Sequence, residues 1–317
     1  MTTRHLVDPE LLPGLELLPP CDINEETLPI MRQGIAEMYR QLPAGETTSA
    51  AVALREIYAD GPEGTPDVRV LLFTPCAGRK VRPLYFHIHG GGFVLGSADM
   101  SVAQCTAIAE DLDCVVASVD YRLAPETVFP GNIEDCYAGL SWVYRHAGSL
   151  GIDPQRIAVG GESAGGGLAA ALALLARDRG EIPIVHQQLV YPMLEDREPA
   201  QRHPCTGEFG WTRASNAYGW RSLLGCEPGG AGVSPYAAAA RAASLRGLPS
   251  TFIGVGSLDL FLESNLEYAR RLSREGVPVE LHVYPGAFHG SDVVAQARLT
   301  QQHLRDQRAA LAAAFDA

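Results

Sequence analysis

Short apolar runs and longer amphipathic segments alternate through the middle of the chain. Between residues 102 and 191 they predict helix, strand, helix, strand, helix and strand, at about 102–111, 114–119, 133–146, 156–160, 166–177 and 184–191. The run at 156–160 is short, β-branched and apolar, which is typical of a buried strand. The alternation therefore predicts an α/β fold in which parallel βαβ units form a central sheet with helices on both faces.

Further elements flank this alternating region. From about Asn24 to Leu42 the apolar residues recur at helical spacing, which predicts an amphipathic helix that buries its stripe against another part of the chain. The stripe consists of Ile30, Met31, Ile35, Met38, Tyr39 and Leu42. Further strands are expected at 51–59, 67–75, 84–88, 251–256 and 279–284, and further helices at about 262–275 and up to residue 315.

Residues 192–249 interrupt the alternation. This segment is rich in Pro, Gly and Ala and carries the aromatic residues Phe209, Trp211, Tyr218, Trp220 and Tyr236. It predicts a mostly helical insertion and not another βα unit. No repeat, low-complexity tract or linker divides the chain, so we expect a single domain over residues 1–317.

Ser163 is the candidate nucleophile, in the stretch Gly161-Glu162-Ser163-Ala164-Gly165. The stretch joins the predicted strand at 156–160 to the helix at 166–177, and a strand, G-x-S-x-G and a helix form the context of a nucleophile elbow. The glycines permit a tight turn that lifts the hydroxyl to the positive end of the helix dipole. The alternative is a glycine-rich turn whose serine merely caps the helix, and the rest of the chain has to decide between the two.

A base and an acid follow the serine in the chain. Asp259 comes after the strand at 251–256 and His289 after the strand at 279–284, at strand ends where open α/β sheets place their sites. The order Ser, Asp, His is that of α/β hydrolases. Glu263, one helical turn beyond Asp259, is its close rival for the acid. The other histidines lie in terminal, helical, inserted or strand segments, so His289 is the predicted base.

The stretch His89-Gly90-Gly91-Gly92 offers backbone N–H groups to the negative charge that acyl transfer develops on a carbonyl oxygen. In lipases and esterases such a loop acts together with the residue after the nucleophile, here Ala164. A phosphate site is not indicated, because no Lys-Ser/Thr pair follows the glycines. His87 and His89 would share a strand face, but no third metal ligand lies nearby in the sequence. We therefore expect neither a metal nor a cofactor.

Composition narrows the functional classes further. Of 317 residues, 46% are hydrophobic and 20% charged, and the formal net charge of −12 argues against nucleic acid and anionic membrane surfaces as partners. The seven cysteines, at positions 21, 76, 105, 114, 136, 205 and 226, are odd in number and form no C-x-x-C pair, which favours free thiols. No secretory signal opens the sequence, and the longest apolar run, 168–176, is too short to span a bilayer. A cytoplasmic protein is expected.

Taken together, these motifs resemble the hormone-sensitive-lipase-like branch of the α/β hydrolases, the bacterial family IV carboxylesterases. The matching stretches are His89-Gly90-Gly91-Gly92-Phe93, Asp120-Tyr121-Arg122-Leu123-Ala124-Pro125-Glu126, Gly161-Glu162-Ser163-Ala164-Gly165, Asp259 and Phe288-His289-Gly290. The resemblance implies an α/β-hydrolase fold, with an eight-stranded, mostly parallel sheet flanked by helices and a helical cap built from about residues 1–45 and 192–249. It also implies that Gly91, Gly92 and Ala164 donate to the oxyanion and that His89 shapes its loop.

Two positions depart from the pattern of that branch. Glu162 stands where Asp or Thr is usual, and Leu260 follows Asp259 where the branch often has Pro. Both changes affect the expected geometry of a loop and leave the three triad residues in place.

The leading hypothesis is a serine carboxylesterase that cleaves small-molecule esters through an acyl-serine intermediate. Ser163 would attack, His289 would carry the proton, and Asp259 would orient the imidazole and stabilise its charged form. The alternatives are an amidase or peptidase on the same scaffold, and a non-catalytic ligand-binding protein of this fold. Proteins of the latter kind typically lose the base, which is present here.

The predicted cap gives an expectation about the substrate. Segments with apolar stripes but no place in the α/β alternation should cover the sheet edge above the nucleophile and limit the acyl chain to short lengths. The candidate substrate-binding residues are the aromatics Phe93, Phe209, Trp211, Tyr218 and Trp220. We expect no stable membrane association, and the sequence leaves open whether the chain forms a homodimer.

Overall fold

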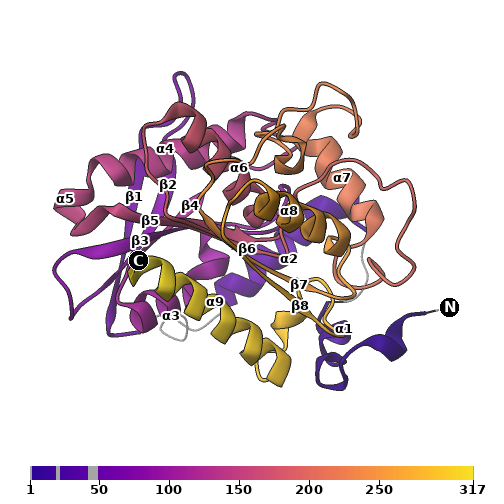
Figure 1. Ribbon diagram of the computed structural model, residues 1–317. Helices are drawn as coiled ribbons and strands as arrows, with labels where there is room; N and C mark the ends of the chain where they lie inside the picture. The colour runs from indigo at the N-terminus through magenta and orange to yellow at the C-terminus, as the bar shows by residue number, and fades with distance from the viewer. Residues whose placement is uncertain (1, 19–21, 42–48, 317) are drawn as a thin grey trace.

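The structure is a computed structural model that describes residues 2–18, 22–41 and 49–316 (Figure 1). In this part of the chain, one sheet contains eight strands in the order β1-β2-β4-β3-β5-β6-β7-β8. The strands are β1 (Val52–Ala59), β2 (Val68–Pro75), β3 (Arg82–Ile88), β4 (Val115–Asp120), β5 (Ile152–Glu162), β6 (His186–Val190), β7 (Ser250–Gly256) and β8 (Val279–Tyr284). β2 is antiparallel to β1 and β4, and all other neighbouring pairs are parallel. The predicted mostly parallel α/β sheet is confirmed.

Helices cover both faces of the sheet (Figure 1). The α3 and α9 side chains share one apolar core, and those of α4, α6 and α8 share the larger core on the other face. Successive strand residues alternate between them, since Phe86 lies in the larger core and Tyr85 in the smaller. The helices are α3 (Val102–Leu112), α4 (Gly131–Arg145), α6 (Ala164–Arg179), α8 (Leu262–Arg274) and α9 (Arg298–Asp316). Shorter elements are η1 (Arg4–Leu6), η2 (Pro9–Leu11), α1 (Gly14–Leu17), η3 (Ala98–Ser101), α5 (Ala147–Leu150) and η5 (Ser291–Val293).

The insertion at 192–249 is less helical than its sequence suggests. Its regular elements are α7 (Arg213–Leu224) and the short 3-10 helix η4 (Ala239–Arg241), and the remainder is turns, bends and irregular backbone. The prediction of a mostly helical insertion is therefore wrong. The physical reason lies in its many Gly and Pro residues, which favour turns over helix propagation.

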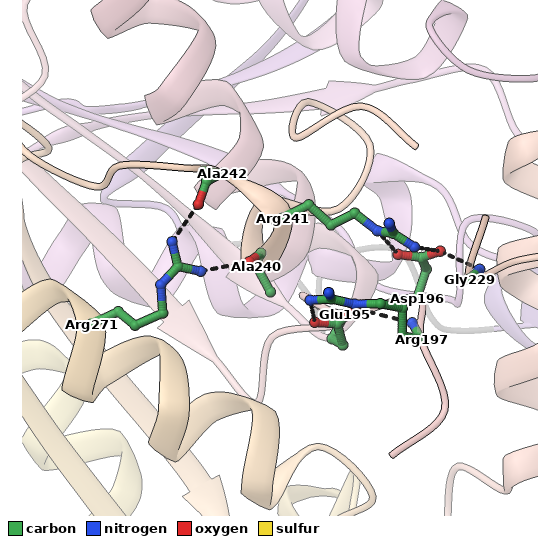
Figure 2. Close-up of polar contacts among 8 residues, drawn as sticks. All are labelled: Glu195, Asp196, Arg197, Gly229, Ala240, Arg241, Ala242 and Arg271. Carbon is green, nitrogen blue, oxygen red and sulfur yellow. Dashed lines mark hydrogen bonds and ion pairs between the residues drawn. The ribbon is translucent and has the colours of Figure 1, made fainter. Parts of the chain in front are cut away.

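Polar side chains hold this irregular backbone in place (Figure 2). The buried Asp196 carboxylate accepts hydrogen bonds from Nε and Nη2 of Arg241, at 2.5 and 2.8 Å, and from the Gly229 backbone N–H at 2.6 Å. From α8, Arg271 donates to the backbone carbonyls of Ala240, at 2.5 Å, and Ala242. Asp196 thus ties distant parts of the insertion to each other, and Arg271 fastens the insertion to α8, because backbone groups that form no helix or strand need such partners.

The predicted N-terminal helix is α2 (Thr27–Gln41). Arg32 fastens it to the loops after β3 and β4, donating to the backbone carbonyls of Val94 and Ala124, both at 2.8 Å. Burial of the predicted apolar stripe is only partial: Met31 and Ile35 pack on the core, but Ile30 and Met38 are 71% and 53% exposed, contrary to expectation. Of the same stripe, the Tyr39 side chain and Leu42 lie outside the described part of the structure.

Two sequence expectations concern the chain as a whole. The described cysteines, six of the seven, are free thiols, and Cys21 lies outside the described residues. Across residues 2–18, 22–41 and 49–316, none of the helices combines the length and apolar character needed to cross a lipid bilayer.

Candidate active site

Ser163 lies in a tight turn between β5 and α6. Its backbone angles, φ 57° and ψ −119°, are strained for a residue with a side chain. Three backbone hydrogen bonds of 2.9 Å hold it there: Ser163 N–H donates to the Val190 carbonyl, and the Ser163 carbonyl accepts from the N–H groups of Gly167 and Met193. The predicted strand-turn-helix context of the nucleophile is therefore present, with the serine at the carboxyl end of β5.

Asp259, His289 and Ser163 form one hydrogen-bonded line. His289 Nδ1 lies 2.8 Å from Asp259 Oδ2, and His289 Nε2 lies 2.9 Å from Ser163 Oγ. A carboxylate can only accept, so Nδ1 carries the hydrogen, and Nε2 is left to accept from the serine hydroxyl. All three side chains are buried, and the other Asp259 oxygen accepts from the Phe261 backbone N–H at 2.8 Å. The rival acid, Glu263, is exposed on the first turn of α8.

Aromatic rings surround the imidazole of His289. Phe261 and Tyr191 stand edge-on to it, with ring centroids 5.2 and 4.7 Å away. The Tyr191 backbone has φ 34°, and its hydroxyl donates to Asp292 Oδ2 at 2.8 Å, which fixes the direction of the ring. Sequence reasoning did not identify Tyr191 or Phe261 as site residues. Their positions, one residue after β6 and two after Asp259, are the signal that could have found them.

The glycine-rich loop after β3 lies against the nucleophile. A Cβ atom placed on Gly90 would lie 3.5 Å from Ser163 Cβ, so the loop and the elbow are in contact. Gly91 and Gly92 have φ values of 119° and 61°. Within the described residues, their N–H groups and that of Ala164 donate to no other group of the protein. The geometry thus leaves free donors beside the serine, which an oxyanion requires.

His89 is turned into its own loop. Its ring stacks on Tyr121 with centroids 4.3 Å apart, and its Nδ1–H donates to the Gly90 carbonyl at 2.8 Å. The Tyr121 hydroxyl in turn donates to the His89 carbonyl at 3.0 Å. Burial lowers the pKa of His89, which keeps the ring neutral. These contacts suit a residue that shapes the loop, as the family resemblance implies.

The five predicted substrate-binding aromatics occupy different environments. Trp211 lies at the site: a Cβ on Gly92 would overlap its indole, and its ring centroid is 6.3 Å from that of His289. Phe93 and Trp220 are fully buried against each other, with centroids 5.1 Å apart. Phe209 packs edge-on against Phe288, and Tyr218 is half-buried against the larger core.

A cavity of about 430 Å³ lies between α7, α8 and the chain after β6. Phe261 belongs to its wall and its ring also contacts that of His289, whereas Ser163 and His289 themselves are not wall residues. Asn216, another wall residue, accepts a hydrogen bond from Trp211 Nε1 at 3.4 Å. Apolar groups of Leu260 and Tyr268 line the cavity together with charged side chains such as Arg213.

The geometry agrees with comparisons to known proteins. Residues 85–292 match the family model described as the alpha/beta hydrolase fold. Esterase LipI of Mycobacterium tuberculosis is 33% identical over 90% of this chain and 88% of its own length, and carboxylesterase NlhH of the same species is 37% identical over 73% of each chain. The solved structure of a bacterial heroin esterase, 40% identical, superposes over 99% of both chains with a TM-score of 0.93. This chain therefore belongs to the α/β-hydrolase family, in its hormone-sensitive-lipase-like branch.

Proposed function

We propose that the protein is a serine carboxylesterase that cleaves small-molecule esters through an acyl-serine intermediate. The observation that carries the proposal is the line of hydrogen bonds from Asp259 through His289 to Ser163, with lengths of 2.8 and 2.9 Å. A base that already accepts the serine hydroxyl hydrogen can remove it as the oxygen attacks. The esterase names of the similar proteins agree with this chemistry.

The reaction takes place in two halves. Ser163 Oγ adds to the ester carbonyl while its proton passes to His289 Nε2, and the carbonyl electron pair moves onto the oxygen. The N–H groups of Gly91, Gly92 and Ala164 stabilise this oxyanion, and Asp259 stabilises the imidazolium. When the electron pair returns, the bond to the alcohol oxygen breaks and that oxygen takes the proton from His289. Water then repeats the sequence on the acyl-serine and releases the acid and the free serine.

We assign a cap over this site to about residues 1–45 and 192–249 of a single domain, of which residues 1, 19–21 and 42–45 lie outside the described part of the structure. The support comes from two contacts with the glycine-rich loop and its continuation. A Cβ on Gly219 of α7 would lie 2.7 Å from the Gly92 carbonyl, so α7 packs directly on the loop. From α2, the Arg32 side chain reaches the Val94 carbonyl just beyond the loop.

The cap makes short acyl esters the preferred substrates. Trp211 stands over Gly92, and its ring centroid is 6.3 Å from that of His289, so the indole limits the room beside the nucleophile. Each methylene adds about 0.8 kcal/mol of transfer free energy while it fits, and adds strain when it no longer does. We expect kcat/KM along the p-nitrophenyl series from acetate to palmitate to peak at roughly four to six carbons. A profile that still rises at palmitate would contradict the cap argument.

Ser163→Ala tests the proposed function directly. The variant should fold like the wild type and lose about 10⁶-fold in kcat on p-nitrophenyl butyrate, because the triad acts as a unit. Retention of more than a few per cent of the activity would refute the assignment of the nucleophile. Parallel assays of butyrate ester and the matched p-nitroanilide separate an esterase from an amidase: faster turnover of the anilide would favour the amidase alternative.

A further inference from the structure

The side chain that directly precedes the nucleophile belongs to a buried polar network across three strands. Glu162 Oε2 lies 3.0 Å from His87 Nε2, and Glu162 Oε1 accepts a hydrogen bond from Gln104 Nε2 at 2.6 Å. His87 Nδ1 lies 3.0 Å from Ser118 Oγ. The His87 side chain is fully buried and that of Glu162 is 15% exposed. The network thus runs from β4 through β3 to the end of β5, with one partner from α3.

The position of this pair connects the two halves of the site. Side chains alternate along a strand, so His87 follows Tyr85 onto the sheet face covered by α3, where Glu162 also finds Gln104. Two residues beyond His87, β3 has become the loop that carries Gly91 and Gly92. One residue beyond Glu162 is the nucleophile. The two strands that the pair joins are therefore the ones that deliver the oxyanion donors and the serine.

The loop and the elbow also touch directly above the pair. A Cβ on Gly90 would lie 2.9 Å from the Glu162 carbonyl oxygen, and one on Gly165 would lie 2.7 Å from the His89 carbonyl carbon. Backbones this close transmit a shift of either strand to the other, because packed interiors leave no slack. The strained φ of 57° at Ser163 also requires the neighbouring strands to stay in place, because such a backbone conformation persists only where its surroundings hold it.

The charge state of the pair favours a rigid contact. Burial alone would raise the pKa of Glu162, but His87 and the hydrogen bond from Gln104 bring it below its ordinary value. Burial likewise works to lower the pKa of His87, but the neighbouring Cys105 sulfur and Glu162 raise it well above the ordinary value. These directions favour the ionised form of both groups, and a hydrogen bond between ionised partners is stronger than one between neutral groups.

We propose that the Glu162–His87 pair is a clamp that sets the position of Ser163 relative to the N–H groups of the glycine-rich loop. Glu162 is then a positioning residue for the transition state, and this role rests on the proposed ester hydrolysis. The contact between residue 162 and His87 depends on the length of the Glu162 side chain. Aspartate, which is usual at this position in the branch, is one methylene shorter and would withdraw the carboxylate from His87.

The test compares Glu162→Ala and Glu162→Gln with the wild type in kcat, KM and the inhibition constant of a trifluoromethyl ketone, which adds Ser163 Oγ to its carbonyl and places an oxyanion at the donors. We expect Glu162→Ala to lower kcat by about 10- to 100-fold, to raise the inhibition constant by a similar factor and to leave KM within about twofold. Glu162→Gln keeps the length and an acceptor for His87 Nε2–H, but it loses the charge and turns an NH₂ group toward the Gln104 donor, so it should recover only part of both losses. His87→Leu should match Glu162→Ala, and the double variant should be no worse than either single one.

Asp113→Asn is the matched control for a merely structural effect. Asp113 pairs with Arg82 Nε at 2.7 Å at the opposite end of β3, so its loss should lower the melting temperature without moving the inhibition constant. If Glu162→Ala fails to fold, Glu162→Asp replaces it in the test. This variant keeps the charge but has a shorter side chain, which withdraws the carboxylate from His87, so it should still raise the inhibition constant several-fold.

An inhibition constant that stays at the wild-type value in the folded Glu162 variant, whatever its melting temperature, would overturn the clamp. A wild-type protein that turns over no ester would instead overturn the proposed function and the clamp with it. Ester turnover by the wild type, combined with an unchanged inhibition constant in the variant, would overturn the clamp alone.

Discussion

Replacing Asp259 by Asn tests the choice of the acid and the tautomer of the base. One Asp259 oxygen accepts from the Phe261 N–H at 2.8 Å, and the other accepts from His289 Nδ1–H at 2.8 Å. In the variant, the amide oxygen keeps the bond to Phe261, which turns the NH₂ group toward Nδ1. Two donors cannot face each other, so the imidazole moves its hydrogen to Nε2. That nitrogen then can no longer accept the proton of Ser163.

The expected loss is large. The wrong tautomer and the missing negative charge beside the imidazolium together should lower kcat/KM by about 10⁴-fold, which corresponds to about 5 kcal/mol of transition-state stabilisation. The fold should persist, because asparagine has almost the same shape and retains the Phe261 hydrogen bond. The assay is the hydrolysis of p-nitrophenyl butyrate, with far-UV circular dichroism to verify folding.

Glu263→Gln is the control for this prediction. Glu263 is exposed on the first turn of α8, one helical turn beyond Asp259, and should tolerate the change with little effect on kcat/KM. Retention of more than about a tenth of the wild-type rate in Asp259→Asn would refute the reasoning. A comparable loss in Glu263→Gln would move the role of the acid to that residue.

Three further predictions concern stability. Trp220→Ala removes a fully buried indole packed on Phe93 and should lower the free energy of unfolding by about 3–5 kcal/mol in urea titrations; a loss below about 1 kcal/mol would contradict this prediction and show that the residues around Phe93 collapse into the space. Asp196→Leu leaves the guanidinium of Arg241, 10% exposed, without its carboxylate and should cost about 3–5 kcal/mol, so an unchanged urea midpoint would contradict the buried pair shown in Figure 2. Burial lowers the pKa of His186 and His303 below the usual 6.5, so in mild acid the unfolded chain binds protons that the folded chain does not. Stability should therefore fall as the pH is lowered from about 6 to 5, a range in which His87, whose pKa is raised, adds little slope because it is largely protonated in both the folded and the unfolded chain. A double replacement of His186 and His303 by Gln and Leu that leaves this slope unchanged would exclude them as its cause.

The local spacing of apolar residues in the sequence determined most of the secondary structure and located the three triad residues. The period of apolar residues predicts each strand of the sheet, and the helices α3, α4, α6 and α8, to within a few residues, whereas for α9 it predicts only the end. Burial of one helical stripe or one strand is a local property of the sequence, which is why these elements could be predicted. Ser163, Asp259 and His289 could be found in the same way. Each follows a predicted strand, and the carboxyl ends of parallel strands necessarily meet at one edge of the sheet.

The tertiary structure decided what depends on contacts between distant residues. Asp259 and Glu263 lie on adjacent turns and have the same chemistry, so only the fold, which brings one carboxylate 2.8 Å from His289, distinguishes them. Trp211 and Trp220 are equally aromatic, yet one stands over the glycine-rich loop and the other fills a core.

The same holds for the insertion and for the network behind the nucleophile. The insertion has weak helical propensity and takes its shape from side-chain bonds such as Arg241 to Asp196, which link residues 45 positions apart. Glu162 and His87 are 75 positions apart, and although the sequence marks Glu162 as unusual beside the nucleophile and His87 as sharing a strand face with His89, nothing in it pairs the two. Pairing across a sheet is set by strand order and register. The period of one strand carries no information about which strand becomes its neighbour.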